Sequence, residues 1–336
     1  MTALLHVPSP ATPPPPRRGS DADAATGSGS GSGVWRRGRI ITGLALSVAL
    51  VMLSHAHLPN RPGSLGSLVE TFLPWTGLAV PLLLSCALIR RSATAAAAVV
   101  LPALIWCSLF GGTLHDKQSD GGDLTVVSHN VNEHNPHPTR TARALAASGA
   151  DLLALEELGD ATPQYERALA DAYPYHVVQG TVGLWSKDPI DTSRTVDIAP
   201  WPRALRAVVR TPEGPVAVYV AHLLSVRLTA ASGFTTAERD AAARHLATAL
   251  RTEPLRRTIL VGDFNGTLDD RELSPVTSRM DSAQTEAGAG FGFTWPSSFP
   301  VARIDHILVR GLTPRASWTL PATDSDHLPV AAKVKW

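Results

Sequence analysis

The sequence is poor in cysteine and in charge. It has only two cysteines, Cys86 and Cys107, in 336 residues. Two thiols cannot build a disulfide scaffold, a cysteine-ligated zinc site or an iron–sulfur centre. Charged residues make up only 18% of the chain, and 30 Lys and Arg against 29 Asp and Glu leave a net charge of +1. This balance excludes a polybasic nucleic-acid binder and an acidic disordered chain.

Long apolar runs dominate the first third of the sequence instead. Residues 40–58, 73–89 and 93–110 contain no Asp, Glu, Lys or Arg. A helix that crosses a membrane needs about 20 apolar residues, with roughly 17 at the short end. A signal peptide followed by buried helices is the alternative, but three runs in succession favour three transmembrane helices. Residues 1–39 hold a polyproline run and alternating Gly and Ser, so we expect a disordered tail there.

The arginines near these runs predict how the chain crosses the membrane. Three arginines lie between residues 36 and 39, just before the first run, and Arg90 and Arg91 separate the second and third runs. The loop between the first and second runs carries only Arg61. Because cytoplasmic loops are enriched in Lys and Arg, the tail and the second loop are expected in the cytoplasm. We therefore expect a multi-pass protein of the cell membrane, with a membrane domain (40–110), a linker (111–122) and an extracytoplasmic domain (123–336).

The second part of the chain has the pattern of a mixed globular domain. Short apolar runs typical of strands alternate with amphipathic stretches typical of helices. Strands are expected at residues 124–127, 152–155, 182–185, 205–209, 216–221, 258–261 and 304–309, and helices at 139–148, 164–172 and 236–250. Mixed strands and helices predict a layered α/β or α+β domain.

Polar side chains follow or end these apolar runs. They occur in Ser-His-Asn-Val-Asn, Leu-Glu-Glu, Val-Ala-His-Leu, Val-Gly-Asp-Phe-Asn, Arg-Ile-Asp-His and Ser-Asp-His-Leu-Pro. The ends of strands are where open sheets gather their functional residues. Carboxylates, amides and imidazoles without cysteine suit a hard, oxygen-preferring cation such as Mg²⁺ or Mn²⁺. The residues concerned are Asn130, Asn132, Glu157, His222, Asp263, Asn265, Asp305, Asp326 and His327.

This ordered series resembles the endonuclease/exonuclease/phosphatase superfamily over about residues 123–336. Each motif alone is weak evidence, but their order and spacing match the family, and Gly-Phe-Thr-Trp-Pro ahead of Arg-Ile-Asp adds to the match. The resemblance implies a DNase I-like four-layered sandwich, with two β-sheets face to face and helices outside. It also implies a metal-dependent hydrolase that cleaves phosphoester bonds.

The resemblance also assigns roles to the residues. Asp263 would orient or deprotonate the attacking water, and Asn265 would hold the phosphoryl group or that water. His222 and His327 would meet the charge that builds in the transition state, and Asp305 would orient His327. Glu157 would bind the metal, with Asn130, Asn132 and Asp326 completing its surroundings. Asn130 and Asn265 are expected to contact substrate, and Asn132 and Asp326 are expected to join Glu157 as metal ligands.

Several alternatives stay open at this point. Glu156 stands where the family often has Gln, and we expect it to point away because adjacent strand residues face opposite sides. Each motif could also be a plain strand end or capped turn, and the nine residues could belong to a non-catalytic binding module. Four arginines are possible ligands for substrate phosphate, although surface charges are the simpler interpretation: Arg140, Arg203, Arg227 and Arg239.

The expected membrane helices and the charge of the domain narrow the range of possible substrates. The domain carries 21 Lys and Arg against 24 Asp and Glu, and a net charge of −3 does not favour polymer DNA. Helices that hold the site beside lipid headgroups favour a lipid-linked phosphate, diphosphate or phosphodiester. The arrangement resembles VanJ-type membrane proteins of actinobacteria, which are linked to teicoplanin resistance, and this implies a role in lipid-carrier metabolism of the cell envelope. A membrane-anchored extracellular nuclease or phosphodiesterase is the alternative.

Overall fold

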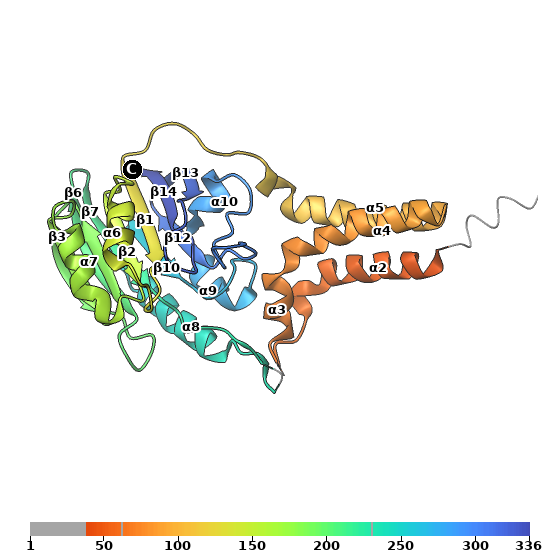
Figure 1. The fold of residues 1–336 in the computed structure, drawn as a ribbon, viewed down its shortest axis with the longest axis horizontal. Coiled ribbons are helices and arrows are strands. Elements are labelled where there is room, and N and C mark those ends of the chain that lie inside the picture. Colours follow the sequence, from red (N-terminus) through yellow and green to blue (C-terminus); the bar gives the residue numbers. More distant parts are fainter. Residues whose placement is uncertain (1–37, 62, 230) are drawn as a thin grey trace, which may run out of the picture.

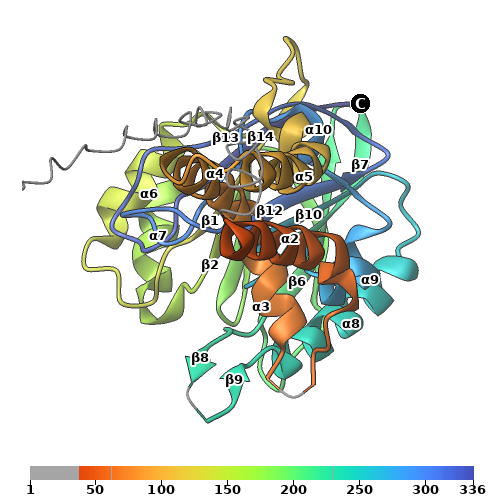
Figure 2. The same cartoon turned by 90° about the vertical axis from the view of Figure 1, so that its right-hand side faces the viewer.

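The N-terminal third forms a set of apolar helices that project from a globular domain (Figure 1). The computed structural model describes residues 38–336 except 62 and 230, so the expected tail (1–39) lies almost wholly outside the described residues. Helices α2 (Arg39–Ser54), α4 (Ala79–Ile89) and α5 (Ala93–Phe110) run side by side (Figures 1 and 2). A short helix, α3 (Leu65–Thr71), lies across their inner ends against the globular domain.

Two of these helices are long and apolar enough to cross a membrane. They span Arg39–His57 and Ala93–Leu114, and less than a quarter of each is buried within the protein. The middle segment differs from the expected straight helix over residues 73–89, because a 3₁₀ stretch (Leu73–Leu78) precedes α4. It passes the same test only together with α3, from which it is bent by 65°. The described residues therefore contain two or three membrane-spanning candidates, and the expected count of three stays a prediction.

The globular domain is built on two six-stranded sheets. The first has the order β13-β14-β1-β2-β4-β3 and the second the order β11-β12-β10-β7-β6-β5. The first contains β1 (Leu124–Asn130), β2 (Leu152–Glu156), β3 (Tyr175–Gln179), β4 (Val182–Ser186), β13 (Thr313–Thr319) and β14 (Val330–Lys335). The second contains β5 (Ile190–Thr195), β6 (Ala204–Thr211), β7 (Gly214–Ala221), β10 (Thr258–Asp263), β11 (Asp281–Ser282) and β12 (Asp305–Arg310).

The sheets pack face to face because alternate residues of their strands are apolar. Val126, Leu152 and Ala154 of the first sheet meet Val218, Val261 and other residues of the second in one buried cluster. The outer face of the first sheet is covered by α6 (Pro138–Ala146) and α7 (Thr162–Leu169), and that of the second by α8 (Ala237–Arg251) and α9 (Ser274–Thr277). Helix α10 (Ala283–Ala287) contributes Ala283 to the cluster between the sheets, and β8 (Leu228–Thr229) and β9 (Gly233–Phe234) form a separate two-stranded hairpin. The four-layered sandwich expected from the sequence is confirmed.

The expected linker, residues 111–122, contacts the globular domain. It begins with a 3₁₀ stretch (Gly111–Leu114) and then runs along the sheet edge, where the amides of Lys117 and Ser119 donate to the carbonyls of Gly288 and Arg315. These hydrogen bonds fix the end of α5 relative to β13.

A buried ion-pair network joins α8 to the loop after β10. Arg239 on α8 is 1% exposed and donates to Asp270 at 2.6 Å and to Asp240 at 2.7 Å. A third contact runs from its guanidinium to the carbonyl oxygen of Asn265, 3.4 Å away. The side chain is therefore an internal support of the loop, and it is not available to a substrate phosphate.

Replacing Arg239 by Met is expected to destabilise the protein by about 3–5 kcal/mol, because it leaves Asp270 buried without its partner. Lys187→Met is the matched control. Lys187 pairs with Asp151 at 3.1 Å on the surface, where the two side chains are 43% and 32% exposed, and such pairs contribute only about 0–1 kcal/mol. Thermal unfolding of the two variants tests this difference, and equal melting temperatures would contradict it.

Candidate active site

The site lies at one end of the sandwich, where strands of both sheets end. Strands β1 and β2 are parallel, as are β7 and β10, and a hydrogen bond between Asn130 and Asp263 joins the carboxyl ends of β1 and β10. Strand β12 runs antiparallel to β10, which places Asp305, its first residue, opposite Asp263, the last residue of β10. The order of the motifs along the chain thus becomes a cluster at one edge of the sandwich.

Asp263 is the centre of this cluster and is 1% exposed. Its carboxylate accepts hydrogen bonds from the Asn130 side chain at 3.1 Å, from the Asn265 backbone at 2.8 Å and from the Asn265 side chain at 3.2 Å. Asn265 adopts a left-handed backbone conformation with φ 48°, which turns both of its donors toward Asp263. Burial raises the pKa of Asp263 above its ordinary value, against the opposing charge of His327. Its carboxylate is therefore held in place and is a better proton acceptor than an exposed aspartate.

Asp305 and His327 form a buried ion pair beside Asp263. The Nδ1 atom of His327 lies 2.9 Å and 3.1 Å from the two carboxylate oxygens of Asp305. Burial alone would lower the pKa of His327, but Asp305 and then Asp263 raise it to about 10. The ring is thus a cation at neutral pH, and its Nε2 atom lies 3.9 Å from Asp263 Oδ2. A fixed imidazolium can stabilise negative charge that develops on a phosphoryl or leaving oxygen.

His222 lies at the same edge but in a different charge state. It follows β7, is 1% exposed, and its Nε2 atom is 3.6 Å from Asp263 and 3.5 Å from Glu157. Burial lowers its pKa well below the ordinary value, and the charges of Arg203 and His327 lower it further. The guanidinium of Arg203 lies against the ring and donates to the His222 carbonyl at 3.0 Å. Of the two histidines, His327 carries a positive charge at neutral pH, and His222 is a neutral imidazole.

The two neighbouring glutamates occupy different places. Strand β2 ends at Glu156, and Glu157 follows with φ 59°, which turns its side chain into the pocket. Glu156 is fully buried between the sheets, where it accepts from Ser128 Oγ at 3.0 Å. Burial and the charges of Asp305 and Asp263 raise its pKa well above the ordinary value. Glu156 thus points away from the pocket, as expected. The reason differs from strand alternation: Glu157 lies beyond the end of β2, and its own left-handed backbone turns its side chain in another direction.

Asp326 and Asn132 close the rim of the site. Asn132, with φ 61°, donates its side-chain amide to Asp326 at 3.0 Å, and the Trp295 indole donates to the same carboxylate at 3.3 Å. These residues, together with Glu157, Asp263, Asn265 and His327, line a pocket of about 580 Å³. Asn130, His222 and Asp305 lie behind this lining and contact it through Asp263 or His327.

The oxygen atoms that face the pocket are suitable ligands for a divalent cation. Glu157 and Asp326 offer carboxylate oxygens and Asn132 an amide oxygen, which is the chemistry that Mg²⁺ and Mn²⁺ prefer. Asp263, Asp305 and His327 also lie together, with ligand atoms within 4.8 Å. Both oxygens of Asp305 already accept from a protonated His327, however, so this trio is better described as an ion pair with a neighbouring acid. When bound, a cation would act as a Lewis acid on a phosphoryl oxygen.

The structure adds residues that the sequence did not single out. Trp295 borders the pocket, and so do Leu68, Thr71 and Phe72 from the N-terminal third of the chain. Of the four arginines considered, only Arg227 lines this pocket, while Arg140 pairs with Asp324 on the surface. The Trp-Pro motif ahead of Arg303 was the available signal for Trp295. The contribution of α3 had no local signal, because it depends on how two distant parts of the chain pack.

Replacing Glu157 by Gln is expected to raise the Mg²⁺ concentration needed for half-maximal activity by at least about tenfold, since the amide keeps one oxygen but loses the charge. Glu156→Gln is the matched control because this residue is buried away from the pocket. Its Mg²⁺ requirement is expected to stay within about twofold of the unchanged protein. Metal titrations of phosphate release compare the two, and a larger effect at Glu156 would reverse the assignment.

Comparisons with known proteins agree with this geometry. The model of the Endonuclease/Exonuclease/phosphatase family matches residues 127–327. Comparison with curated protein sequences gives no match. Among solved structures, humanized Danio rerio TDP2 is similar with a TM-score of 0.52 and 21% identity, over 63% of this chain and 99% of that one.

Two further structures share the fold. Mannosyl-6-phosphatase Bt3783 of Bacteroides thetaiotaomicron has a TM-score of 0.52 and 16% identity, over 64% of this chain and 100% of its own. Beta toxin of Staphylococcus aureus has a TM-score of 0.51 and 15% identity, over 62% of this chain and 99% of its own. The family match covers all nine site residues. The chain belongs to the endonuclease/exonuclease/phosphatase family of metal-dependent enzymes that hydrolyse phosphoester bonds.

Proposed function

We propose that this protein is a membrane-anchored, Mg²⁺-dependent phosphohydrolase that acts on the phosphate or diphosphate of a lipid-linked cell-envelope substrate. The observation that carries the proposal is the composition of the catalytic pocket. The pocket is lined by Asp263 and His327 and also by an apolar wall, Leu68, Thr71 and Phe72, from the segment between the apolar helices. A pocket that joins a polar reaction centre to an apolar wall suits a substrate with a charged head and a hydrocarbon body.

The apolar wall is fixed to the catalytic domain by polar contacts. Ser67 on α3 donates to Asp270 at 3.1 Å, and Glu70 on the same helix pairs with Arg271 at 3.2 Å. Asn60 donates to Glu272 at 3.0 Å. Because Asp270 also binds Arg239, these contacts join the N-terminal helices to the support of the catalytic loop. This arrangement supports a pocket whose mouth lies next to a membrane surface.

Charge and donor chemistry support the same class of substrate. The domain's net charge of −3 gives no overall attraction for polymer DNA. The oxygen donors of the pocket favour Mg²⁺ as the ion. The sequence resemblance to VanJ-type proteins supports a link to glycopeptide resistance, since those proteins join apolar N-terminal helices to a domain of this family.

Cleavage of a panel of substrates tests the proposal. The full chain in lipid nanodiscs is expected to release inorganic phosphate from a polyprenyl diphosphate faster than it forms monoester products from phospholipids, and to cut DNA slowest, with Mg²⁺ and not with a chelator. Asp263→Asn is the inactive control. Faster cleavage of DNA than of every lipid phosphate would replace this proposal by a membrane-anchored nuclease, and no turnover on any substrate would favour a binding module.

The orientation of the domain gives a separate prediction. Arginines before α2 and at residues 90–91 place those segments in the cytoplasm by the positive-inside rule, which leaves the catalytic domain outside if the chain crosses three times. A phosphatase reporter that folds only outside the cytoplasm, fused after Trp336, is expected to be active. A cytoplasm-only reporter at the same place is the matched control. Activity of that control instead would contradict three crossings and the envelope role.

A further inference from the structure

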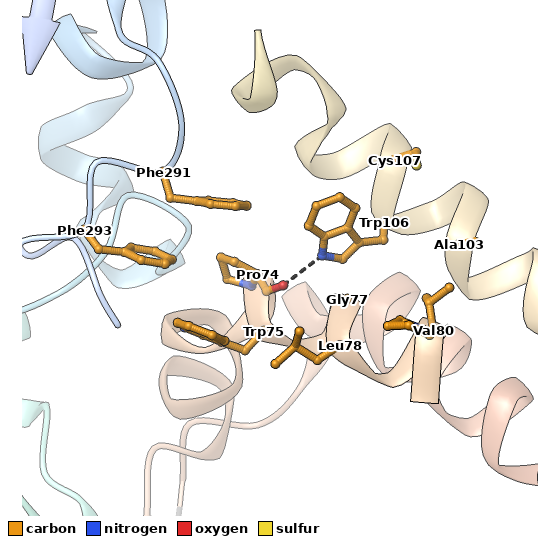
Figure 3. A pocket seen from close by; sticks show the side chains of 11 residues that line it. Pro74, Trp75, Gly77, Leu78, Val80, Ala103, Trp106, Cys107, Phe291 and Phe293 are labelled. Carbon is orange, nitrogen blue, oxygen red and sulfur yellow. Dashed lines mark hydrogen bonds between the residues drawn. The ribbon is translucent and has the colours of Figure 1, made fainter. Parts of the chain in front are cut away.

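A second hollow lies beside the catalytic pocket, at the junction of the apolar helices and the globular domain (Figure 3). Its volume is about 420 Å³, within the range of roughly 300–1,000 Å³ of ligand pockets. We call it the aromatic groove. Figure 3 shows Phe291 and Phe293 on one side with Trp75 beneath Phe293, and Trp106 across from them on α5. Its lining is Pro74, Trp75, Gly77, Leu78, Val80, Pro81, Ala103, Trp106, Cys107, Phe291 and Phe293.

The aromatic rings of the groove are held by specific contacts. The Trp106 indole donates to the Pro74 carbonyl at 2.8 Å, and the Trp75 indole donates to the Val301 carbonyl at 2.7 Å. Trp75 stacks on Phe293 with ring centroids 5.6 Å apart, and Phe293 stacks on Phe291 at 5.1 Å. With their polar N–H groups already paired, the two indoles present apolar faces to the hollow.

The groove and the catalytic pocket are neighbours, separated by one turn of the chain. Phe72 lines the catalytic pocket, while Pro74 and Trp75 line the groove, and the Trp75 amide donates to the Phe72 carbonyl at 3.1 Å. A second segment of the chain also contributes to both hollows. Phe293 lines the groove, whereas Trp295, two residues later, lines the catalytic pocket. The two hollows are therefore adjacent on two segments of the chain, at Phe72–Trp75 and at Phe293–Trp295.

We propose that the aromatic groove binds the hydrocarbon chain of the lipid substrate next to its phosphate group, while that phosphate lies in the catalytic pocket. This inference rests on the proposed function and deepens it. The occupant is a lipid chain because the groove opens between α4 and α5, one of which is long enough to span a membrane, and because its lining offers apolar surface throughout. Tryptophans are enriched at the membrane–water boundary, and Trp75 and Trp106 lie where the apolar helices meet the globular domain.

The groove would give the enzyme selectivity for chain length. Each methylene group buried in it is worth about fourfold in affinity. A long-chain polyprenyl diphosphate reaches the groove from the catalytic pocket, whereas dimethylallyl diphosphate, with the same head and a single prenyl unit, is too short to fill it. The ratio of kcat/KM for the long substrate over the short one therefore reports occupation of the groove.

Filling the groove tests the proposal by turnover. Ala103→Phe places a ring in the hollow, and Leu104→Phe is the matched control because the neighbouring Leu104 is 63% exposed and does not line the groove. In nanodiscs we expect Ala103→Phe to lower the long-to-short ratio at least about tenfold and Leu104→Phe to leave the ratio unchanged. An unchanged ratio in Ala103→Phe would overturn the proposal.

Chemical protection tests it without turnover. Cys107 lines the groove and is exposed, and Cys86→Ser leaves it as the single thiol of the chain. In phosphatidylcholine nanodiscs with chelator, added polyprenyl diphosphate is expected to slow alkylation of Cys107 by N-ethylmaleimide, whereas dimethylallyl diphosphate is not. Equal rates with both compounds would contradict occupation of the groove.

The two measurements separate this inference from the proposed function. Protection of Cys107 without hydrolysis of any lipid phosphate would support the groove and reject the proposed reaction. Hydrolysis of the long-chain substrate with no protection and no effect of Ala103→Phe would support the reaction and reject the groove.

Discussion

Asp263→Asn is expected to lower kcat by about 10²–10⁴-fold, because the amide cannot accept a proton from the attacking water. The substitution also turns an NH₂ group toward donors on Asn130 and Asn265 that now hydrogen-bond to the carboxylate. Phosphate release at saturating Mg²⁺ measures the loss, and a melting temperature within a few degrees of the unchanged protein shows that the fold is retained.

The matched control for Asp263→Asn is Asp281→Asn on the short strand β11. Asp281 is an exposed aspartate of the same sheet that lies outside the pocket, so its substitution is expected to leave kcat unchanged. Full activity of Asp263→Asn in the presence of chelator would reject both the role of Asp263 and the need for metal.

Asp305→Asn is expected to change the pH dependence of catalysis, because Asp305 makes the largest contribution among the carboxylates that keep His327 protonated. The pKa of His327 is raised from 6.5 to about 10, so its charge contributes stability below pH 6.5 and loses that contribution as pH rises through about 10. An opposite charge within hydrogen-bond distance changes a pKa by about 1–3. The alkaline limb of the profile of kcat/KM is therefore expected to move to lower pH by at least about one unit.

His327→Ala provides the comparison for that profile. It removes the imidazolium altogether and is expected to lower kcat by about 10²–10³-fold at every pH, with the alkaline limb lost. A profile of Asp305→Asn identical to that of the unchanged protein would show that a protonated His327 is not required.

The site was predictable in its composition because each polar residue ends or begins an apolar run. Alternating burial within β10 and β12 requires Val261 and Ile307 to face the other sheet, and Asp263 and Asp305 continue the same face. The strongest strands were recognised for the same reason. Edge strands β3, β5 and β13 were missed because their residues are mostly half-buried or exposed, so little apolar alternation marks them. The central strand β14 was missed as well, although most of its residues are buried.

Helix α3 shows what a local pattern cannot predict. Its sequence, Leu-Gly-Ser-Leu-Val-Glu-Thr, is short and contains Gly and Ser, which favour other conformations. Ser67 and Glu70 are buried only because Asp270 and Arg271, about 200 residues later, are their partners. No periodicity within residues 59–72 carries that information, and so the wall of the catalytic pocket was unforeseen.

The sequence by itself determined the apolar N-terminal helices, the layered domain and the residues of the site, because burial periodicity and the chemistry of side chains at strand ends are local properties. Only the tertiary structure decided how those residues are used. Packing between the sheets determines that His327 is charged and His222 neutral, and left-handed residues after β2 and β10 orient Glu157 and Asn265. Docking of α3 adds an apolar wall to the pocket that Asp263 lines. Charge state and pocket shape depend on the distances between groups far apart in the chain, and folding alone sets those distances.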